Sequence, residues 1–359
     1  MHYYIISGEL SGDLYGSKLM CSLKKKDINA RFTCWGGEYM KAAGGNMVRN
    51  LDDLSFIGFL EVLKNGCSIL KNYLFAKKNI KNERPDAVIL IDYPGFNLQI
   101  AKYAKKINIP VFWFIAPQVW AWKKNRIKKM QKYIDKLFVA LPFELEYFSK
   151  HNIETYYFGH PLLDVKLHCN EPIEMLGKPI ISLMPGSRKQ EVKRILPVML
   201  QVVKHFLAYR FVVICANSIN RSFYEDIANG FNVELKFDKH ILSLSEAVLV
   251  ASGTATLELT ILNLPQVVCY KLHPVSYLLA RFFANIKYIS LVNILANKMV
   301  VSELIQNNFN AKNLIKELNL ILSRKRKNEI SSEYDTIVKQ LGEPGCFDKI
   351  SKEIYLGLI

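Results

Sequence analysis

The sequence predicts an α/β protein with two Rossmann-like domains that face a central cleft. Three observations lead to this prediction. A chain of 359 residues suits two domains of ordinary size, each able to bury its own core. Short apolar runs alternate steadily with stretches of helical spacing, which is typical of a doubly wound parallel sheet. The alternation lapses at residues 159–179, where proline and glycine indicate a linker, and then restarts.

The first domain is expected at residues 1–165. Apolar runs bounded by turns predict its strands, and apolar residues near helical spacing predict its helices. The last expected helix has its apolar stripe at Ile127, Met130, Ile134 and Leu137. In chain order, the expected elements are a strand at 2–6, a helix to about residue 26, a strand at 31–35, a partly helical region at 54–81, a strand at 87–91, a helix at 97–107, a strand at 111–115 and a helix at 123–136.

The second domain is expected at residues 178–335 and repeats the pattern. One helix begins near Pro197 or is kinked there, because proline lacks the backbone N–H that a helix interior needs. The other expected elements are strands at 180–184, 211–216, 247–251 and 266–270 and a helix at 311–322. The tail, from about 336 to 359, is apolar enough to dock, and we expect it to return to the first domain.

Composition limits the class of protein. Half of the residues are hydrophobic and the mean hydropathy is +0.07, as expected for a globular protein with large cores. No uncharged apolar run reaches the roughly 20 residues of a membrane span. The first residues have no basic lead and reach Glu9 and Asp13 too soon for a signal peptide. Seven cysteines without a CxxC pair favour reduced thiols in a cytosol and argue against a metal site.

The formal net charge of +16 indicates an anionic partner, either a nucleic acid, a lipid surface or a phosphorylated substrate. Part of this charge lies in region 54–81, where Lys64, Lys71, Lys77 and Lys78 stand among apolar residues. Such a pattern is typical of a membrane-facing patch. It is equally typical of a core helix with a solvated basic face, so both interpretations stay open.

The stretch at 252–258 predicts an anion-binding turn. It follows the apolar strand at 247–251 and opens a helix, so that free backbone amides and the helix dipole attract a phosphate. Ser252, Thr254 and Thr256 add hydroxyl donors, and the carboxylate of Glu258 could accept from ribose hydroxyls. Arg188, in the glycine turn after the strand at 180–184, suits a bidentate phosphate contact. The competing interpretations are an ordinary strand-to-helix turn and a surface ion pair.

Three loops of the first domain also follow strands. They lie at 8–13, at Asp92 and at 117–122, and the first of them is glycine-rich without the GxGxxG spacing of dinucleotide sites. Because ligands bind at the carboxyl ends of parallel strands, we expect these loops and those of the second domain to line one active site. Asp92 there is a candidate catalyst, although a helix cap is an equally common role for such a residue. Trp120 and Trp122 suit either the core or a sugar or acyl face.

These motifs resemble those of the lipid-A-disaccharide synthases, in that family's order and spacing. The similarity runs from residue 7 to about 303, and the last fifty or so residues match by position alone. The second-half motifs are shared more widely among GT-B glycosyltransferases. The matching blocks are SGELSGD at 7–13, IDYPGFN at 91–97, PQVWAW at 117–122, GHP at 159–161, PGSR at 185–188 and ASGTATLE at 251–258.

The resemblance implies a GT-B fold and an inverting transfer. The donor would be UDP-2,3-diacylglucosamine, and the acceptor would be 2,3-diacylglucosamine 1-phosphate, also called lipid X. The products would be a β-1,6-linked disaccharide 1-phosphate and UDP. The enzyme would work in the cytoplasm, peripherally on the anionic inner face of the cytoplasmic membrane, without nucleic acid. The resemblance leaves a homodimer open.

The resemblance also assigns roles by position. Asp92 would be the general base, and Glu9 is its rival. No cofactor is expected, and no metal, because the chain contains no Asp-x-Asp to hold one beside the diphosphate. The acceptor would contact Gly8, Gly12, Asp13, Gln118, Trp120 and Trp122. UDP would contact Gly186, Ser187, Arg188, Ser252, Gly253, Thr254, Ala255, Thr256, Glu258 and Asn293.

Three interpretations remain at this point. The first is the lipid glycosyltransferase. The second is another UDP-sugar enzyme of the same fold, such as a UDP-N-acetylglucosamine 2-epimerase or the peptidoglycan undecaprenyl transferase. The third is a basic module that binds nucleic acid, although its basic residues are scattered over many helices and no nucleic-acid motif is present.

Overall fold

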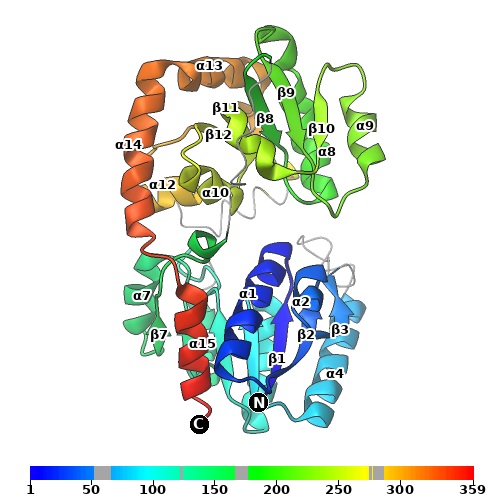
Figure 1. The fold of residues 1–359 in the computed structure, drawn as a ribbon, viewed down its shortest axis with the longest axis vertical. Coiled ribbons are helices and arrows are strands. Elements are labelled where there is room, and N and C mark those ends of the chain that lie inside the picture. Colours follow the sequence, from blue (N-terminus) through cyan, green and yellow to red (C-terminus); the bar gives the residue numbers. More distant parts are fainter. Residues whose placement is uncertain (52–65, 122–123, 166–176, 275–276, 278–286) are drawn as a thin grey trace. The chain divides into compact units, whose positions relative to one another are not determined.

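The computed structural model describes residues 1–51, 66–121, 124–165, 177–274, 277 and 287–359. The chain forms two compact units: unit 1 comprises Met1–Asp164 and Leu341–Ile359, and unit 2 comprises Val165–Gln340. Each unit contains a parallel sheet with helices packed against it (Figure 1). The predicted α/β class with two Rossmann-like sheets is confirmed.

The sheet of unit 1 has the strand order β3-β2-β1-β4-β5-β6-β7, and all of its pairings are parallel. The order reverses between β1 and β4, which is where a doubly wound sheet accepts a ligand. Every residue of β1 and β4 is buried, so the apolar side chains of these two strands form the centre of the core. The strands are β1 His2–Ser7, β2 Arg31–Gly36, β3 Asn46–Asn50, β4 Ala87–Ile91, β5 Val111–Phe114, β6 Lys136–Phe138 and β7 Thr155–Tyr156.

The helices Leu10–Lys26, Gly66–Glu83 and Pro94–Lys106 lie where helices were predicted, and residues 54–65 of the predicted region 54–81 lie outside the described residues. The single helix predicted at residues 123–136 is wrong. There a 3-10 turn, Lys124–Arg126, leads into the short helix α6, Ile127–Tyr133, and the chain is extended again at Ile134. Leu137 was therefore wrongly assigned to the apolar stripe of a helix, because it lies in β6, a three-residue strand between β5 and β7. The other helices are α1 Leu10–Lys26, α2 Glu38–Ala42, α4 Gly66–Glu83, α5 Pro94–Lys106, α7 Pro142–Ser149 and α15 Cys346–Leu356.

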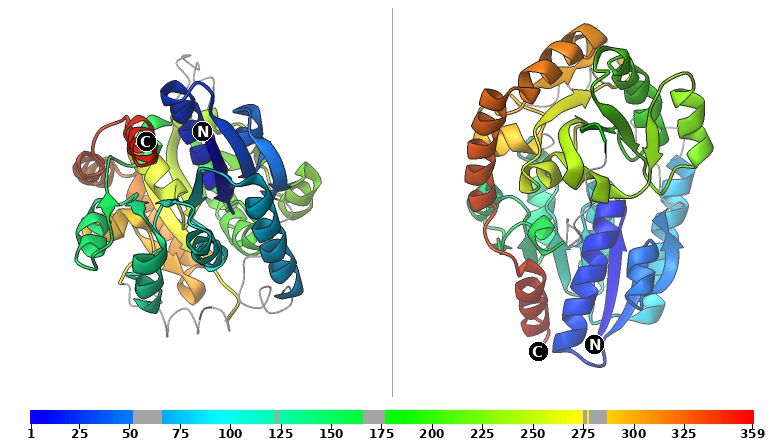
Figure 2. Two further views of the ribbon diagram at one scale, coloured as in Figure 1. Left: turned by 90° about the horizontal axis from the view of Figure 1, so that it is seen from below. Right: turned by 45° about the horizontal axis from the view of Figure 1, so that its top comes forward.

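The C-terminal helix α15 packs beside α1 within unit 1 (Figures 1 and 2). Its Phe347 ring contacts the rings of Tyr15 and Phe114. The segment before it is held by the 159–161 motif. A side chain at Gly159, which has φ +100°, would meet the Glu343 carbonyl, and the His160 amide donates to the Leu341 carbonyl at 3.0 Å.

The sheet of unit 2 has the order β10-β9-β8-β11-β12-β13, again parallel throughout. The expected helix start near Pro197 is wrong, because α8 begins at Lys189 and carries this proline inside it. The strands are β8 Ile180–Met184, β9 Arg210–Ile214, β10 Glu234–Lys236, β11 Ser245–Ala251, β12 Gln266–Tyr270 and β13 Glu303–Ile305. The helices are α8 Lys189–Leu200, α9 Arg221–Ala228, α10 Ala255–Ile261, α12 Leu291–Ala296, α13 Ala311–Leu322 and α14 Arg324–Gln340.

The buried ring of His160 makes the stability of unit 1 depend on pH. Its Nδ1 atom accepts from the Leu162 amide at 3.1 Å, and burial lowers the pKa of the ring from 6.5 to about 4. In the unfolded chain the His160 ring binds a proton as the pH falls through 6.5. In the folded chain the same ring is protonated only as the pH falls through about 4. This contribution is complete above pH 6.5 and is lost as the pH falls toward 4, by about 3 kcal/mol in all.

We predict that His160→Asn removes this dependence, because its amide oxygen replaces Nδ1 as acceptor and does not titrate. Urea unfolding from pH 7.5 to 4.5 should show the wild type losing more stability than the variant below pH 6.5. The control for replacing a histidine in unit 1 is His151→Asn, because His151 is only half-buried. Parallel curves for His160→Asn and wild type would contradict the prediction.

Candidate functional site

The turn at Asp92 is the most constrained part of the carboxyl edge in unit 1. Asp92 and Tyr93 both have left-handed backbones, with φ of +46° and +49°, and Pro94 then begins α5. Non-glycine residues in this region cost about 1–3 kcal/mol each and gather at functional sites. The turn is fixed by Asn97, whose Nδ2 donates to the Asp92 carbonyl at 2.7 Å. Because Asn97 is fully buried, it holds the half-exposed Asp92 in place, a role that the sequence motif did not reveal.

The next strand, β5, also ends in a strained residue. Ile115 has φ +65°, which is rare for a β-branched side chain, and its carbonyl accepts from the Trp113 indole at 3.1 Å. The loop 117–121 starts two residues later. In it Gln118 is exposed and Trp120 is half-buried. Trp122, also predicted to contact the acceptor, lies outside the described residues.

The glycines of the first loop allow close packing. A side chain at Gly8 would lie 2.4 Å from the Tyr93 ring, and one at Gly12 would lie 2.3 Å from Ser7 Oγ. Gly8 therefore brings the 8–13 loop against the turn that carries Asp92. Glu9 stands at the N-cap of α1, partly exposed. The predicted acceptor contacts of Gly8 and Gly12 and the catalytic role of Glu9 stay predictions.

Asp13 has a structural task. Its side chain is 1% exposed, and its two oxygens accept from the amides of Gly37, Tyr39 and Met40 at 2.7–3.1 Å. It thereby caps α2 and joins the loops that follow β1 and β2. An acceptor contact from Asp13 would have to compete with these bonds, so that part of the prediction is untested while its structural role is observed.

Glu144, on the first turn of α7, is a buried carboxyl that the sequence motifs did not include. It is 2% exposed, and its Oε1 accepts from the Trp120 indole at 2.9 Å while Oε2 accepts from the Leu141 amide at 3.1 Å. Its pKa is raised from 4.5 to about 7, mainly by burial and in small part by the charge of Asp92, while the hydrogen bonds that it accepts lower this pKa. A perturbed carboxyl beside a strained turn indicates a functional site.

In unit 2, the predicted phosphate turn at 186–188 contains an internal anion. Gly186 has φ +114°, and a side chain there would lie 2.5 Å from the Glu191 carboxylate. That carboxylate accepts from the Ser187 amide at 3.2 Å and from the Arg188 guanidinium at 3.0 Å. Arg188 is 43% exposed, so its ion pair lies within reach of solvent.

The turn at 252–258 has the predicted strand-to-helix geometry, with Thr254 as N-cap of α10. Its internal bonds begin at Thr256, whose amide and hydroxyl both donate to the Gly253 carbonyl, at 3.1 and 2.8 Å. Within the described part of the chain, these bonds leave the amides of Gly253, Thr254 and Ala255 for an anion. The buried Thr256 hydroxyl is engaged in the turn, and Ser252 Oγ donates to the Ile289 carbonyl at 3.1 Å.

Glu258 forms an ion pair with a lysine from the 3-10 turn before β11. The Lys239 ammonium donates to both of its oxygens, at 2.9 and 2.7 Å. The Glu258 side chain is 11% exposed and that of Lys239 is 54% exposed. Each carboxylate oxygen keeps a further lone pair for a hydroxyl, so this pairing is compatible with the predicted ribose contact.

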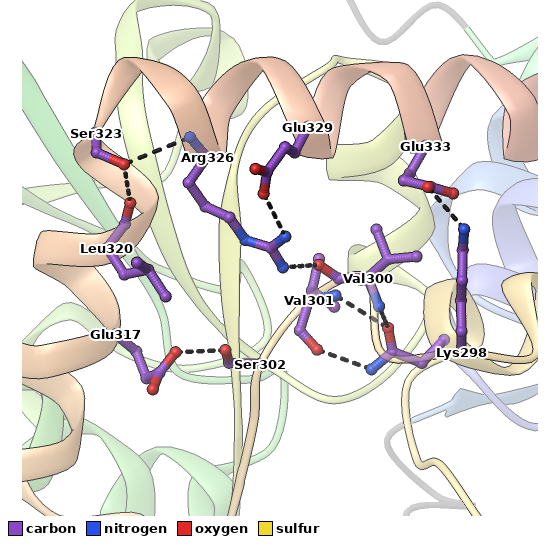
Figure 3. A network of polar contacts seen from close by, with 11 residues as sticks. Lys298, Val300, Val301, Ser302, Glu317, Leu320, Ser323, Arg326, Glu329 and Glu333 are labelled. Carbon is purple, nitrogen blue, oxygen red and sulfur yellow. Dashed lines mark hydrogen bonds and ion pairs between the residues drawn. The ribbon is translucent and has the colours of Figure 1, made fainter.

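Asn293 is fully buried and all of its hydrogen-bonding capacity is used. Its Nδ2 donates to the Val301 carbonyl and to Glu303, and its Oδ1 accepts from the amides of Val300 and Val301, all at 2.8–3.0 Å. Figure 3 shows the same loop from the side of α14, where Arg326 donates to the Val300 carbonyl. A nucleotide contact from Asn293 would require one of these bonds to break, so it is untested and the observed role is structural.

Within the described ranges, no group of three or more His, Cys, Asp or Glu side chains is placed to hold a metal ion. In those same ranges, no helix is both long enough and apolar enough to cross a membrane.

The chain is similar in sequence to lipid-A-disaccharide synthases from several bacteria. A family model described as "Lipid-A-disaccharide synthetase" matches residues 3–352. A lipid-A-disaccharide synthase of Syntrophus aciditrophicus is 36% identical over 96% of this chain and 94% of its own length. Those of Coxiella burnetii and Francisella tularensis subsp. novicida are 33% and 36% identical and cover 98% and 95% of this chain, and 97% and 95% of their own lengths.

Solved structures with much lower identity share the fold. A Staphylococcus aureus MnaA–UDP co-structure has a TM-score of 0.68 at 13% identity, covering 100% of this chain and 97% of that one. A putative UDP-N-acetylglucosamine 2-epimerase from Listeria monocytogenes has 0.70 at 12%, covering 99% and 96%. Acinetobacter baumannii MurG has 0.56 at 12%, covering 99% of each chain. These neighbours confirm the predicted GT-B fold and carry no information on substrate at such identities.

Proposed function

The chain belongs to the lipid-A-disaccharide synthase family and is a glycosyltransferase of lipid A synthesis, and from this we propose which sugars it joins. The donor is UDP-2,3-diacylglucosamine and the acceptor is 2,3-diacylglucosamine 1-phosphate. The acceptor 6-hydroxyl oxygen attacks the anomeric carbon, and the bond from that carbon to the diphosphate breaks with its electron pair. Inversion gives the β-1,6-linked disaccharide 1-phosphate and UDP.

The observation that carries this proposal is the placement of Asp92. A single displacement needs a base for the proton of the attacking hydroxyl, held in place before its pKa matters. Asp92 stands at the end of a fully buried strand, in a left-handed turn that Asn97 fixes through a buried bond. We assign Asp92 as the base and keep Glu9 as its rival, because Gly8 packs the Glu9 loop against the same turn.

The donor half supplies a cation and amides for the leaving diphosphate. In the proposal, the diphosphate takes the place of the Glu191 carboxylate on Arg188, and the amides of 253–255 and Ser187 bind its other oxygens. Glu258 accepts from the ribose hydroxyls while its two oxygens also accept from the Lys239 ammonium. Asn293 supports the neighbouring loop through its buried hydrogen bonds, and its predicted contact with UDP stays a prediction.

Family membership favours the first of the three interpretations of the sequence. The 2-epimerase and MurG structures share the fold at 12–15% identity, whereas the lipid-A-disaccharide synthases are 31–36% identical over 95% or more of the chain. The net charge of +16 then suits a phosphorylated lipid and an anionic membrane surface.

A membrane-facing patch on α4 would bring the enzyme to its lipid substrates. Leu70 and Leu74 are 57% and 53% exposed one helical turn apart, and the exposed Lys71 and Lys78 lie on the same helix. Lys77 is less suited, because its ammonium lies over the Tyr73 and Tyr103 rings at 5.4 and 4.9 Å. The remaining residue of the predicted patch, Lys64, lies outside the described residues. We propose peripheral binding to the inner face of the cytoplasmic membrane through α4.

The donor assignment predicts that Arg188→Ala weakens UDP binding. Loss of a charge-assisted bond to phosphate costs about 1.5–3 kcal/mol, which is at least a tenfold rise in Kd. Titration calorimetry with UDP measures the change, and Arg194→Ala, in the helix α8 that Arg188 precedes and bonded to Gln190, is the matched control. Equal Kd values for Arg188→Ala and wild type would remove Arg188 from the site.

The catalytic assignment predicts that Asp92→Asn lowers turnover by about 10²–10⁴-fold, because the amide keeps the shape but cannot accept the proton. The assay uses purified protein and the two acylated sugars, with the disaccharide identified by mass. UDP affinity, measured in parallel, should stay unchanged. If Glu9→Gln is inactive and Asp92→Asn is nearly normal, Glu9 is the base. If both retain turnover, the mechanism is wrong.

The membrane assignment predicts that Lys71→Gln with Lys78→Gln weakens binding to anionic vesicles by roughly 2 kcal/mol, at about 1 kcal/mol per charge. Vesicle sedimentation measures the loss, and UDP binding should be spared. Lys312→Gln with Lys316→Gln removes the same charge from the exposed face of α13 in unit 2. An equal loss in both double variants would show that net charge, not the α4 patch, sets the affinity.

A further inference from the structure

Glu144 connects a helix of unit 1 to the loop that was expected to contact the acceptor. Only one of its two oxygens caps α7, by accepting from the Leu141 amide at 3.1 Å. The other accepts from the indole of Trp120, 24 residues away, at 2.9 Å. The Trp120 ring also packs edge-on against Phe143 at 5.0 Å. A residue that only caps a helix would need neither the second contact nor nearly complete burial.

The topology places this contact beside the proposed base. Strands β4, β5 and β6 are neighbours in the sheet and run parallel, so their carboxyl ends lie at one edge. Asp92 follows β4, Trp120 follows β5 and Glu144 follows β6. The Asp92 amide donates to the Phe114 carbonyl, and the Ile115 amide donates to the Phe138 carbonyl. Hydrogen bonds therefore join the end of β4 to the end of β5, and the end of β5 to the end of β6. The negative charge of Asp92 raises the pKa of the Glu144 carboxyl.

We propose that Glu144 is a positioning residue of the transfer reaction, whose carboxylate fixes Trp120 and the loop 117–121 beside Asp92 so that the acceptor sugar is held against the base. The proposal rests on the proposed function, because it takes Asp92 as the base. Glu144 itself touches no reacting atom in this scheme. It acts through the Trp120 indole.

The chemistry of the pair requires a carboxylate. Two N–H groups, from Trp120 and Leu141, point at the two oxygens, and an ionised carboxyl accepts on both. Glutamine offers one oxygen and one amide group, which itself donates, so one of the two bonds must be lost. Protonation has a similar effect, and burial places the pKa of Glu144 at about 7. The loop should therefore be held more firmly above pH 7 than below it.

Several groups act on this carboxyl from the elements around it. The indole of Trp120 and the amides of Leu141 and Ala140 favour its ionised form, while burial and the charge of Asp92 oppose it. Tyr157, following β7, also interacts with its charge. Glu144→Gln removes the titrating group and leaves these neighbours in place.

The test compares Glu144→Gln with Glu146→Gln in the intact protein. Glu146 lies two residues along α7, is 76% exposed and pairs with Lys150, so it controls for loss of a carboxylate on the same helix. Hydrogen exchange of the 115–121 segment, read by mass spectrometry at pH 8, should rise at least tenfold in Glu144→Gln and stay at the wild-type rate in Glu146→Gln. In the wild type, exchange corrected for its intrinsic pH dependence should rise as the pH falls through about 7, and Glu144→Gln should lack this step.

Kinetics give the second readout. Glu144→Gln should lower kcat/KM for the acceptor roughly tenfold and leave the UDP Kd unchanged, because UDP is bound by unit 2. Trp120→Phe removes the same indole bond and keeps the carboxylate, so it covers the case in which Glu144→Gln fails to fold. The double variant should lose less than the product of the two single losses, because both remove one contact.

The proposal is overturned if exchange of 115–121 is the same in Glu144→Gln, Trp120→Phe and wild type. It is also overturned if the two losses multiply independently. Wild-type protein that forms no disaccharide refutes the proposed function alone, since the exchange experiment needs no substrate and still decides whether Glu144 fixes the loop.

Discussion

The left-handed turn at the end of β4 is the constraint on which the candidate site of unit 1 depends. Two successive residues, Asp92 and Tyr93, occupy a backbone region that costs each of them about 1–3 kcal/mol. Glycine would remove this cost, but it would also remove the carboxylate and the ring against which Gly8 packs. The strain is offset by the burial of β4 on both faces and by the Asn97 bond. Side-chain direction at the edge is thus set by a rigid core.

Buried or partly buried carboxylates hold the loops around both candidate sites. Asp13 accepts from three amides after β2, Glu144 joins the β5 loop to α7, and Glu303 accepts from the amides of Ile289 and Ser290 as well as from Asn293. An ionised carboxylate can accept several bonds and donates none, which suits it to turns rich in free N–H groups. These acids are therefore committed to internal contacts. The chain has 48 basic and 32 acidic residues, so its basic residues outnumber the acidic ones by 16.

The central strands could be predicted because burial on both faces gives continuous apolar runs. The strands β4, β8 and β12 have the predicted bounds, and so does helix α13. Strands of two or three residues, such as the interior strand β6 and the edge strands β7, β10 and β13, are too short for any period to show. This is why the end of α6 and the start of β6 merged into one predicted helix.

The candidate site was predictable at the level of loops and less so at the level of side chains. Sequence motifs indicate which turns follow which strands, but not whether a polar side chain faces a ligand or its own backbone. Thr256 and Asn293 were predicted to contact UDP, and both satisfy their hydrogen bonds internally. Glu144 carried no signal, because it lies outside the motifs and reaches Trp120, 24 residues away in the sequence, only through the tertiary fold.

The two ion pairs at the candidate site of unit 2 differ in how easily a ligand could replace one of their partners. Arg188 and Glu191 are 43% and 34% exposed, and exposed pairs of this kind contribute only about 0–1 kcal/mol. A diphosphate can therefore take Arg188 from Glu191 at little cost. The Glu258 side chain is 11% exposed, and both of its oxygens accept from the Lys239 ammonium. Breaking this ion pair would leave a mostly buried carboxylate without its cation, which is costly. It follows that Arg188 is suited to exchange its partner on binding and release, whereas Glu258 is suited to stay fixed and accept additional hydroxyls.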